Sequence, residues 1–258
     1  MAKHFFKYHG AGNDFVLIDN REDEFHLMDK ATIQKLCAYH TGIGADGLIL
    51  LNSHPDFPFE MKYFNADGAE GTLCGNGSRC AVLFAKHLGM VVDEVTFLAS
   101  DGSHKAWINN GEITVDIRPV KIGRQLLGGI WIHTGSPHLV LMVDNLDQFT
   151  VDANGLVLRN HSELSPEGAN INFVEQLNED SFAVRTFERG VERETLSCGT
   201  GAVAVALAMH QTRRTNKSPL KVVMKGGTLE VKFVQTSDGF ENIELTGPAR
   251  FVFKGELS

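Results

Sequence analysis

The feature that most constrains the fold of this chain is an internal duplication. In the first half, the alternating segment 59–65 is followed by a polar turn, by Cys74-Gly75-Asn76-Gly77 and by an apolar stretch. In the second half, the alternating segment 182–188 is followed by a turn one residue longer, by Cys198-Gly199-Thr200-Gly201 and by another apolar stretch. Alternation predicts a strand, and the alanine-rich apolar run after the second turn favours a helix. The order strand, turn, Cys-Gly-x-Gly, helix therefore occurs twice.

A second pair of segments repeats in the same order. Residues 12–20 and 135–145 each consist of a polar loop, an apolar strand and a final Asp-Asn. Between the halves, Pro119 and three glycines interrupt the pattern, so we expect a linker within 118–129. We therefore predict two similar halves, residues 1–119 with Cys74 and residues 120–258 with Cys198, the last few residues being able to pack back onto the first half.

Composition and charge exclude several classes of protein. The chain has 258 residues, of which 43% are hydrophobic and 22% charged, enough for a sizeable core. Its net charge is −8 and no Lys/Arg cluster stands out, so nucleic acid and anionic membranes are not expected partners. The first residues are polar and no apolar run reaches membrane-spanning length. We expect a cytoplasmic protein.

The four cysteines indicate thiol chemistry rather than a scaffold. Cys37, Cys74, Cys80 and Cys198 are too few and too scattered for a disulfide framework, and none forms a C-x-x-C pair suited to zinc. No metal is expected. Cys37 and Cys80 lack flanking glycines and are interpreted as structural. For Cys74 and Cys198, two buried structural thiols are the alternative to a catalytic pair.

Glycines at the start of a helix suit a site for an anion. They let the backbone approach a ligand and leave the first N–H groups of the helix free for a carboxylate. A cysteine at such a start lies in positive potential, which lowers its pKa from about 8.5 and raises the thiolate fraction. Two such turns facing each other would give one α-carbon a sulfur on each face. One thiolate would remove the α-proton and the opposite thiol would return a proton.

This chemistry predicts a two-base racemase or epimerase in which Cys74 and Cys198 are the catalytic residues. An α-proton beside a carboxylate is far less acidic than a thiol, so the developing carbanion needs hydrogen-bond donors. The backbone amides suited to this are those of Gly75, Asn76, Gly199 and Thr200.

Two motifs resemble the signatures of the diaminopimelate epimerase family. The first is Asn65-Ala66-Asp67-Gly68-Ala69-Glu70 followed by Cys74-Gly75-Asn76-Gly77-Ser78-Arg79-Cys80. The second is Glu188-Arg189-Gly190 followed by Glu194-Thr195-Leu196-Ser197-Cys198-Gly199-Thr200-Gly201-Ala202. Further similarity at 10–15, 42–46, 135–138 and 168–174 extends the resemblance over nearly the whole chain.

The resemblance implies a fold, a reaction and a set of site residues. The fold is α+β, with two pseudo-symmetric halves, each a mixed sheet wrapped around a central helix, and the active site in the cleft between them. The reaction is the interconversion of LL- and meso-diaminopimelate without a cofactor, in lysine and cell-wall precursor synthesis. His138 and Glu188 are expected to tune the thiols, and Arg189 suits the distal carboxylate. The residues expected to bind substrate are Asn13, Asn65, Gly75, Asn76, Ser136, Asn170, Glu188, Arg189, Gly199 and Thr200.

The chain departs from the family pattern at three places. Gly47 stands where many members have a substrate-contacting Gln, and Ser136 replaces a common Asn. The stretch 191–194 holds one residue more than usual.

Other functions stay open at this stage. A two-cysteine racemase acting on proline or hydroxyproline would share the chemistry, although its first cysteine usually precedes Gly-His-Gly. A redox protein could use Cys74 and Cys198 as a switchable disulfide. A pyridoxal-phosphate racemase is possible on chemistry alone. The sequence also leaves a homodimer open.

Overall fold

The chain divides into two compact units. The computed structural model describes residues 3–22, 25, 29–71 and 73–257. Unit 1 comprises the chain up to Val115 together with the end of the chain from Gly247, and unit 2 comprises Asp116–Thr246. The end of the chain joins unit 1 because strand β18 (Arg250–Leu257) pairs with β1 (Lys3–Gly10). A domain boundary after residue 119 stays a prediction.

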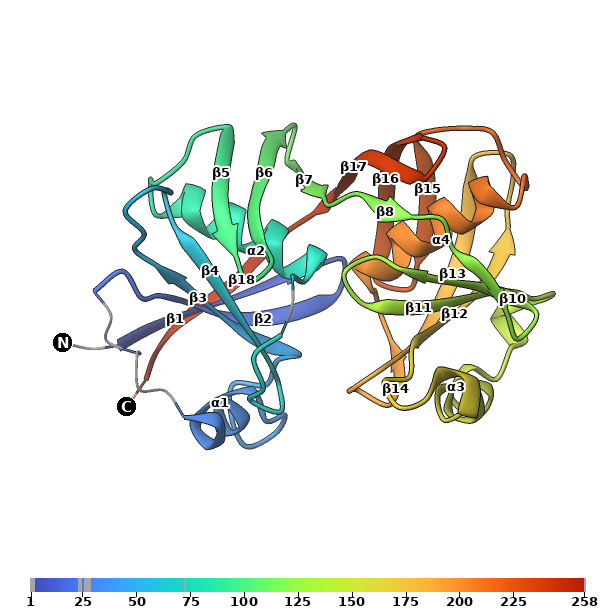
Figure 1. Ribbon diagram of the computed structural model, residues 1–258. Helices are drawn as coiled ribbons and strands as arrows, with labels where there is room; N and C mark the ends of the chain where they lie inside the picture. Colours follow the sequence, from blue (N-terminus) through green and yellow to red (C-terminus); the bar gives the residue numbers. More distant parts are fainter. Residues whose placement is uncertain (1–2, 23–24, 26–28, 72, 258) are drawn as a thin grey trace. The chain divides into compact units, whose positions relative to one another are not determined.

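Unit 1 is a mixed sheet with one long helix packed on it. The strands lie in the order β18-β1-β2-β3-β4-β5-β6-β7, with β2/β3 and β4/β5 parallel and the other described pairs antiparallel. Helix α2 (Gly75–His87) contacts β1 to β4 and β6, and α1 (Lys30–Cys37) packs near β3 (Figure 1). The remaining strands are β2 (Asn13–Asp19), β3 (Gly47–Asn52), β4 (Glu60–Asn65), β5 (Glu94–Ala99), β6 (Gly102–Asn109) and β7 (Glu112–Ile117).

Unit 2 repeats this order of pairing. Its strands follow β9-β10-β11-β12-β13-β15-β16-β17, and β11/β12 and β13/β15 are the parallel pairs. Helix α4 (Gly199–Gln211) contacts β10 to β13, β15 and β16, as α2 does in unit 1. The predicted duplication and α+β fold are therefore confirmed. The strands are β9 (Arg124–Leu126), β10 (Gly129–His133), β11 (Pro137–Met142), β12 (Asn170–Gln176), β13 (Ser181–Glu188), β15 (Leu220–Met224), β16 (Gly227–Gln235) and β17 (Gly239–Pro248).

Unit 2 also contains several shorter elements. Strand β14 (Arg193–Thr195) pairs with β13, and α3 (Val151–Arg159) packs against β12, β13 and β14. Two single turns of 3-10 helix are η1 (Leu146–Gln148) and η2 (Ser162–Leu164). The segment 118–129 is not a plain linker, because β8 (Val120–Lys121) pairs with β17 and β9 pairs with β10.

The apolar run after Cys198 forms a helix that the sheet covers on every side. Residues 202–209 of α4 are all buried. Alanine dominates this run, so the helix can approach the surrounding strands closely without overfilling the core. The helix predicted from the length and alanine content of this run is confirmed.

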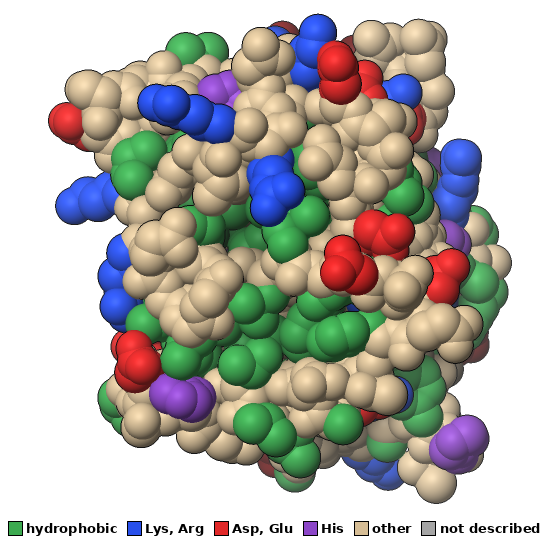
Figure 2. Space-filling view, turned by 90° about the vertical axis from the view of Figure 1, so that its right-hand side faces the viewer, with side chains coloured by type: hydrophobic (Ala, Val, Ile, Leu, Met, Phe, Trp, Pro, Cys, Tyr) green, Lys and Arg blue, Asp and Glu red, His purple; other side chains and the backbone are tan. Residues whose placement is uncertain are grey.

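The surface carries charges of both signs. Figure 2 shows one face on which Lys and Arg side chains stand among Asp and Glu side chains, with hydrophobic side chains gathered in a hollow. Among the described residues, no helix is both long and apolar enough to cross a membrane.

Candidate active site

Cys74 is the N-cap residue of α2. Its backbone is extended (φ −105°, ψ 112°), and its sulfur accepts a hydrogen bond from the Gly77 N–H at 3.4 Å. The sulfur also lies 3.8 Å from Oδ1 of Asn13. A Cβ at Gly77 would lie 3.0 Å from Cδ1 of Ile49, so glycine lets the first turn pack tightly under the thiol. The sulfur thus lies in the field of a helix N-terminus.

Asn13 has a fixed orientation beside this thiol. Its Nδ2 donates to Oδ2 of Asp46 at 2.7 Å, while its Oδ1 accepts from Nδ2 of Asn76 at 3.2 Å. Because a carboxylate only accepts, the amide cannot turn over without losing both bonds. The carbonyl oxygen of Asn13 is therefore the atom that faces Cys74.

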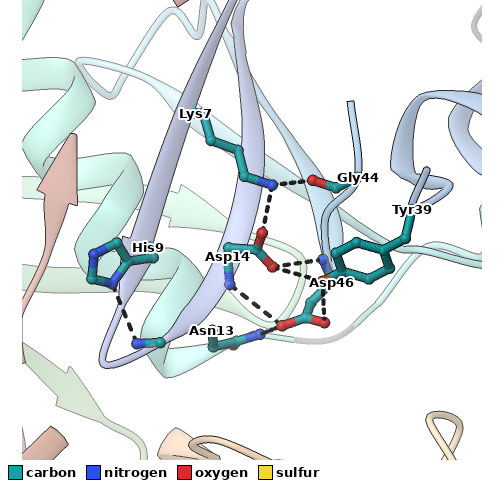
Figure 3. Close-up of polar contacts among 8 residues, drawn as sticks. Lys7, His9, Asn13, Asp14, Tyr39, Gly44 and Asp46 are labelled. Atoms are coloured by element: carbon teal, nitrogen blue, oxygen red, sulfur yellow. Dashed lines mark hydrogen bonds and ion pairs between the residues drawn. The ribbon is translucent and has the colours of Figure 1, made fainter. Parts of the chain in front are cut away.

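A partly buried charge cluster around Lys7 holds Asp46 in place (Figure 3). Lys7 forms an ion pair with Asp14 at 2.5 Å and donates to the Gly44 carbonyl. The Tyr39 hydroxyl lies 3.1 Å from a carboxylate oxygen of Asp14 and 3.2 Å from one of Asp46. Burial raises the pKa of Asp46, and its hydrogen bond from Asn13 opposes that shift. The cluster ties the starts of the parallel strands β2 and β3 together.

Arg79 is a fully buried cation one turn into α2. Burial lowers its pKa to about 10, which is still well above neutrality, so the guanidinium stays charged at neutral pH. This charge adds to the positive potential that the helix N-terminus exerts at Cys74. Its donors bond to Oδ1 of Asn76 and to the carbonyls of Gly75 and Pro248.

The other two thiols, those of Cys37 and Cys80, are buried. Burial raises the pKa of Cys80, and it raises that of Cys37 to about 12. Both are free cysteines in the structure. Such thiols carry almost no thiolate at neutral pH, which agrees with their structural interpretation.

Asn65 ends β4 and is exposed. Its Oδ1 accepts a hydrogen bond from the Tyr63 hydroxyl at 2.9 Å. Gly47 lies opposite Asn65 in the β3/β4 register. A Cβ at Gly47 would lie 2.6 Å from both the Tyr63 ring and the Phe64 carbonyl oxygen, so any side chain at this position would require the neighbours to move.

Cys198 is the N-cap residue of α4 and repeats the position of Cys74. Its backbone is extended (φ −127°, ψ 112°), and its side chain is 6% exposed. The sulfur lies 3.6 Å from the Thr200 hydroxyl. A Cβ at Gly201 would lie 2.7 Å from Oδ1 of Asn172 and 3.3 Å from the sulfur. As at Gly77, only glycine leaves room for the first turn beneath the thiol.

His138 is fully buried next to this second thiol. Nδ2 of Asn172, which can only donate, lies 3.1 Å from Nδ1 of His138. The neutral ring therefore carries its proton on Nε2, which lies 3.0 Å from the Thr200 hydroxyl. With His138 donating to that oxygen, the Thr200 hydroxyl can direct its own proton at Cys198. Burial, followed by the charges of His133 and Arg189, lowers the pKa of His138 to about 3.

The low pKa of His138 predicts a loss of stability in mild acid. The unfolded chain takes up a proton near pH 6.5, whereas the native ring resists protonation until about pH 3. The free energy of unfolding therefore falls as the pH drops through this window, by about 2 kcal/mol between pH 6.5 and 5 from this residue alone. Urea unfolding at both pH values would measure the loss. We expect the His138→Gln variant to lack this contribution. If the free energy of unfolding fell equally with pH in both proteins, His138 would not be its source.

Asn170 and Ser136 complete the polar surroundings of His138. Nδ2 of Asn170 donates to the Ser136 hydroxyl at 3.1 Å, and its Oδ1 accepts the backbone N–H of Arg189 at 2.9 Å. The Ser136 hydroxyl lies 3.0 Å from Nε2 of His138 and 3.3 Å from the Thr200 hydroxyl. Both ends of the Asn170 amide are therefore engaged within the protein.

Glu188 and Arg189 follow one another where β13 ends. Oε2 of Glu188 accepts a hydrogen bond from the Thr195 hydroxyl at 2.8 Å. Nη1 of Arg189 donates to the Glu167 carbonyl at 3.3 Å, and Arg189 forms no ion pair with any residue that the structure describes. Arg185, within β13, is by contrast fully paired with Glu194. Arg189 thus keeps guanidinium donors for a ligand carboxylate.

Comparison with known proteins gives the family. The diaminopimelate epimerase model matches residues 5–122 and 130–252, one match in each half of the chain. The diaminopimelate epimerase of Flavobacterium psychrophilum is 47% identical over 250 residues, which cover 96% of this chain and 98% of that protein. The chain belongs to the diaminopimelate epimerase family.

Solved structures show that the fold extends beyond the family. A PhzF-family phenazine biosynthesis protein of Bacillus anthracis is similar with a TM-score of 0.78 and 17% identity, covering 100% of this chain and 99% of that one. A hydroxyproline epimerase of Agrobacterium vitis is similar with a TM-score of 0.75 and 13% identity, covering 99% of this chain and 92% of that one. At such identities the likeness concerns the fold alone.

The three departures from the family pattern each have defined local surroundings. Gly47 faces the Tyr63 ring, and Ser136 bonds to His138, Thr200 and Asn170 through its short hydroxyl. The longer stretch 191–194 turns through Glu192, which has φ 57°, and its carboxylate accepts the Gly190 N–H at 2.9 Å.

Several residues of this family member were missed by sequence reasoning. They are Asp46, Tyr39 and Lys7 around Asn13, Arg79 beneath Cys74, Asn172 beside His138 and Tyr63 beside Asn65. Four of them stand in segments already noted: Asp46 in 42–46, Tyr63 in 59–65, Arg79 in the first signature and Asn172 in 168–174. A signal was available for Asp46, because polar residues before two parallel neighbouring strands meet at one sheet edge.

Proposed function

We propose that this protein interconverts LL- and meso-2,6-diaminopimelate without a cofactor, using Cys74 and Cys198 as acid and base. One observation carries the proposal beyond family membership. Both cysteines cap the equivalent central helices of two units that share one order of strand pairing. A duplicated scaffold that repeats a thiol at a helix N-terminus suits a reaction whose two half-steps are mirror images.

In the proposed reaction, each thiol serves one face of the α-carbon. The thiolate removes the α-proton, and the thiol of the other unit delivers a proton to the opposite face, so that configuration inverts and the two sulfurs exchange roles. The substrate carboxylate beside that carbon gains negative charge in the transition state. The first N–H groups of α2 and α4, at Gly75, Asn76, Gly199 and Thr200, are the proposed donors to it.

The surroundings of Cys198 support its activation. His138 is neutral with its proton on Nε2, and donation to Thr200 leaves the threonine hydroxyl proton for the sulfur. A hydroxyl donor stabilises a thiolate over a thiol. In this proposal His138 acts through Thr200 and does not itself exchange protons with the substrate.

Binding of the rest of the substrate is assigned to residues near each thiol. Arg189, which forms no described ion pair, binds the distal carboxylate. Asn13, Asn65 and Glu188 contact the substrate's polar groups. Asn170 and Ser136 take part mainly by fixing Arg189 and His138, because their hydrogen-bonding atoms already serve these neighbours.

The proposed setting follows from this chemistry. The reaction would supply meso-diaminopimelate for lysine and cell-wall precursor synthesis. The cytoplasm is the proposed compartment, because its reducing conditions keep both thiols free. A homodimer is the proposed assembly, which sedimentation measurements would test.

The proposed function predicts coupled exchange and inversion in heavy water. We expect the reduced protein, incubated with LL-diaminopimelate in D₂O, to replace the α-proton with deuterium and to form the meso isomer, as followed by NMR. The measurement needs no added cofactor. Conversion of proline or hydroxyproline instead would favour the alternative racemase. Reversible disulfide formation with no exchange on any amino acid would favour a redox protein, and an aldimine absorbance band would indicate pyridoxal phosphate.

A further inference from the structure

The Tyr63 ring occupies space that two glycines leave open. A Cβ at Gly47 would lie 2.6 Å from Cε2 of this ring, and a Cβ at Gly71 would lie 2.6 Å from both Cδ1 and Cε1. Neither glycine has a positive φ. A positive φ is therefore not what requires glycine at these positions. At Gly71 the ring excludes a side chain, and at Gly47 the ring and the Phe64 carbonyl oxygen both do so.

The strand register explains why the ring lies there. In the β3/β4 pair, Tyr63 stands opposite Ile49 and Asn65 stands opposite Gly47. Tyr63 and Asn65 are two residues apart, so both side chains leave the same face, and Gly47 is the diagonal neighbour of Tyr63. The Phe15 ring packs edge-on against Tyr63, with centroids 6.0 Å apart and an interplanar angle of 80°. The ring therefore leans along the strand toward Asn65.

In this position the Tyr63 hydroxyl fixes the orientation of the Asn65 amide. A phenol is protonated at neutral pH and donates its proton here, since Oδ1 of Asn65 can only accept. The bond is 2.9 Å long. Nδ2 of Asn65 has no hydrogen-bond partner among the residues that the structure describes. The side chain is exposed, so its two N–H groups remain available to a ligand.

We propose that Tyr63 is a positioning residue that orients Asn65 so that its amide donates to a substrate carboxylate. The inference rests on the proposed function and deepens it, because it names the chemistry of this contact. Without the hydrogen bond from Tyr63, the Asn65 side chain would turn its carbonyl toward the carboxylate about as readily as its NH₂ group. The Tyr63 hydroxyl removes that second orientation without touching the substrate.

The kinetic test compares Tyr63→Phe with wild type in the epimerase reaction. The variant keeps the ring between the glycines and removes only the hydroxyl. We expect KM for LL-diaminopimelate to rise about fivefold, as the loss of one ordinary hydrogen bond implies, with kcat within about twofold. Tyr8→Phe is the matched control, since its hydroxyl bonds to His87 and not to the site. An unchanged KM in Tyr63→Phe, or an equal rise in Tyr8→Phe, would overturn the proposal.

A double-mutant cycle separates positioning from a general structural effect. In an Asn65→Ala background, adding Tyr63→Phe is expected to change KM by less than about 1.5-fold, because the proposed effect of the hydroxyl on substrate binding passes through Asn65. A further fivefold rise in that background would mean that Tyr63 acts elsewhere.

A direct readout does not depend on activity. The side-chain NH₂ signals of Asn65, assigned by their absence in Asn65→Ala, are expected to move in the ¹H–¹⁵N spectrum of Tyr63→Phe. Signals that do not shift would contradict the proposal that the Tyr63 hydroxyl orients Asn65. Wild-type protein that fails to epimerise diaminopimelate would overturn the proposed function, and these signals would still decide whether Tyr63 orients Asn65.

Discussion

Replacing either Cys74 or Cys198 with alanine is expected to reduce epimerisation by at least about 10³- to 10⁴-fold. Inversion needs a base on one face of the α-carbon and an acid on the other, so the loss of one sulfur stops the reaction in both directions. The N–H groups at the start of α2 and α4 would remain, because the Cys74 sulfur supplies only one capping hydrogen bond to α2 and the Cys198 side chain supplies none to α4. Substrate binding should therefore survive the loss of either thiol.

The remaining thiol predicts a second, sharper result. In D₂O, each alanine variant should still exchange the α-proton of the one isomer whose hydrogen faces its intact cysteine, with retention of configuration. Cys74→Ala and Cys198→Ala should exchange opposite isomers. NMR of the α-proton, combined with chiral separation of the products, measures both outcomes.

Cys37→Ala is the matched control for these variants. Cys37 is buried, and its raised pKa keeps it a thiol, so its loss should leave the epimerisation rate within about twofold of wild type. An alanine variant at Cys74 or Cys198 that still epimerises within tenfold of wild type would rule out the two-base mechanism.

The elements that carry the cysteines could be predicted from the sequence because their signals are local. Period-two alternation predicted the strands β4 and β13, and the apolar run after Cys198 predicted α4. The repeat of these signals predicted the duplication. The segment 118–129 was harder, because strands of two and three residues are too short to show a period.

The contacts that orient the site could not be predicted because they join residues far apart in the chain. Arg79 donates to the carbonyl of Pro248, and Asn13 is held by Asp46. The sequence predicted that the Asn170 amide contacts the substrate. In the structure, this amide donates to the Ser136 hydroxyl and accepts from the Arg189 N–H. Sequence motifs indicate which residue types are present, whereas the direction of an amide depends on its neighbours in space.

Replacing Arg189 with methionine is expected to lower kcat/KM for LL-diaminopimelate by about 10²- to 10³-fold. A bidentate pair between a guanidinium and a carboxylate contributes roughly twice the energy of a neutral hydrogen bond at each contact. The structure leaves these donors available, because Arg189 reaches only the Glu167 carbonyl, while Arg185 is used by Glu194. Arg189→Lys keeps the positive charge but not the planar guanidinium, so it should lower kcat/KM by less, about tenfold.

Arg193→Met supplies the matched control, because Arg193 lies on the adjacent short strand β14 and is exposed. Its kcat/KM should stay within about twofold of wild type. The effect of Arg189→Met should also be specific to the distal carboxylate. For a substrate analogue that carries an amide in place of that carboxylate, the same substitution should lower kcat/KM only slightly. Steady-state kinetics on both compounds would measure this difference. If kcat/KM for diaminopimelate fell less than threefold, or fell equally for the amide analogue, the distal carboxylate would bind elsewhere. Arg189 would then serve the site mainly through the hydrogen bond from its backbone N–H to Asn170.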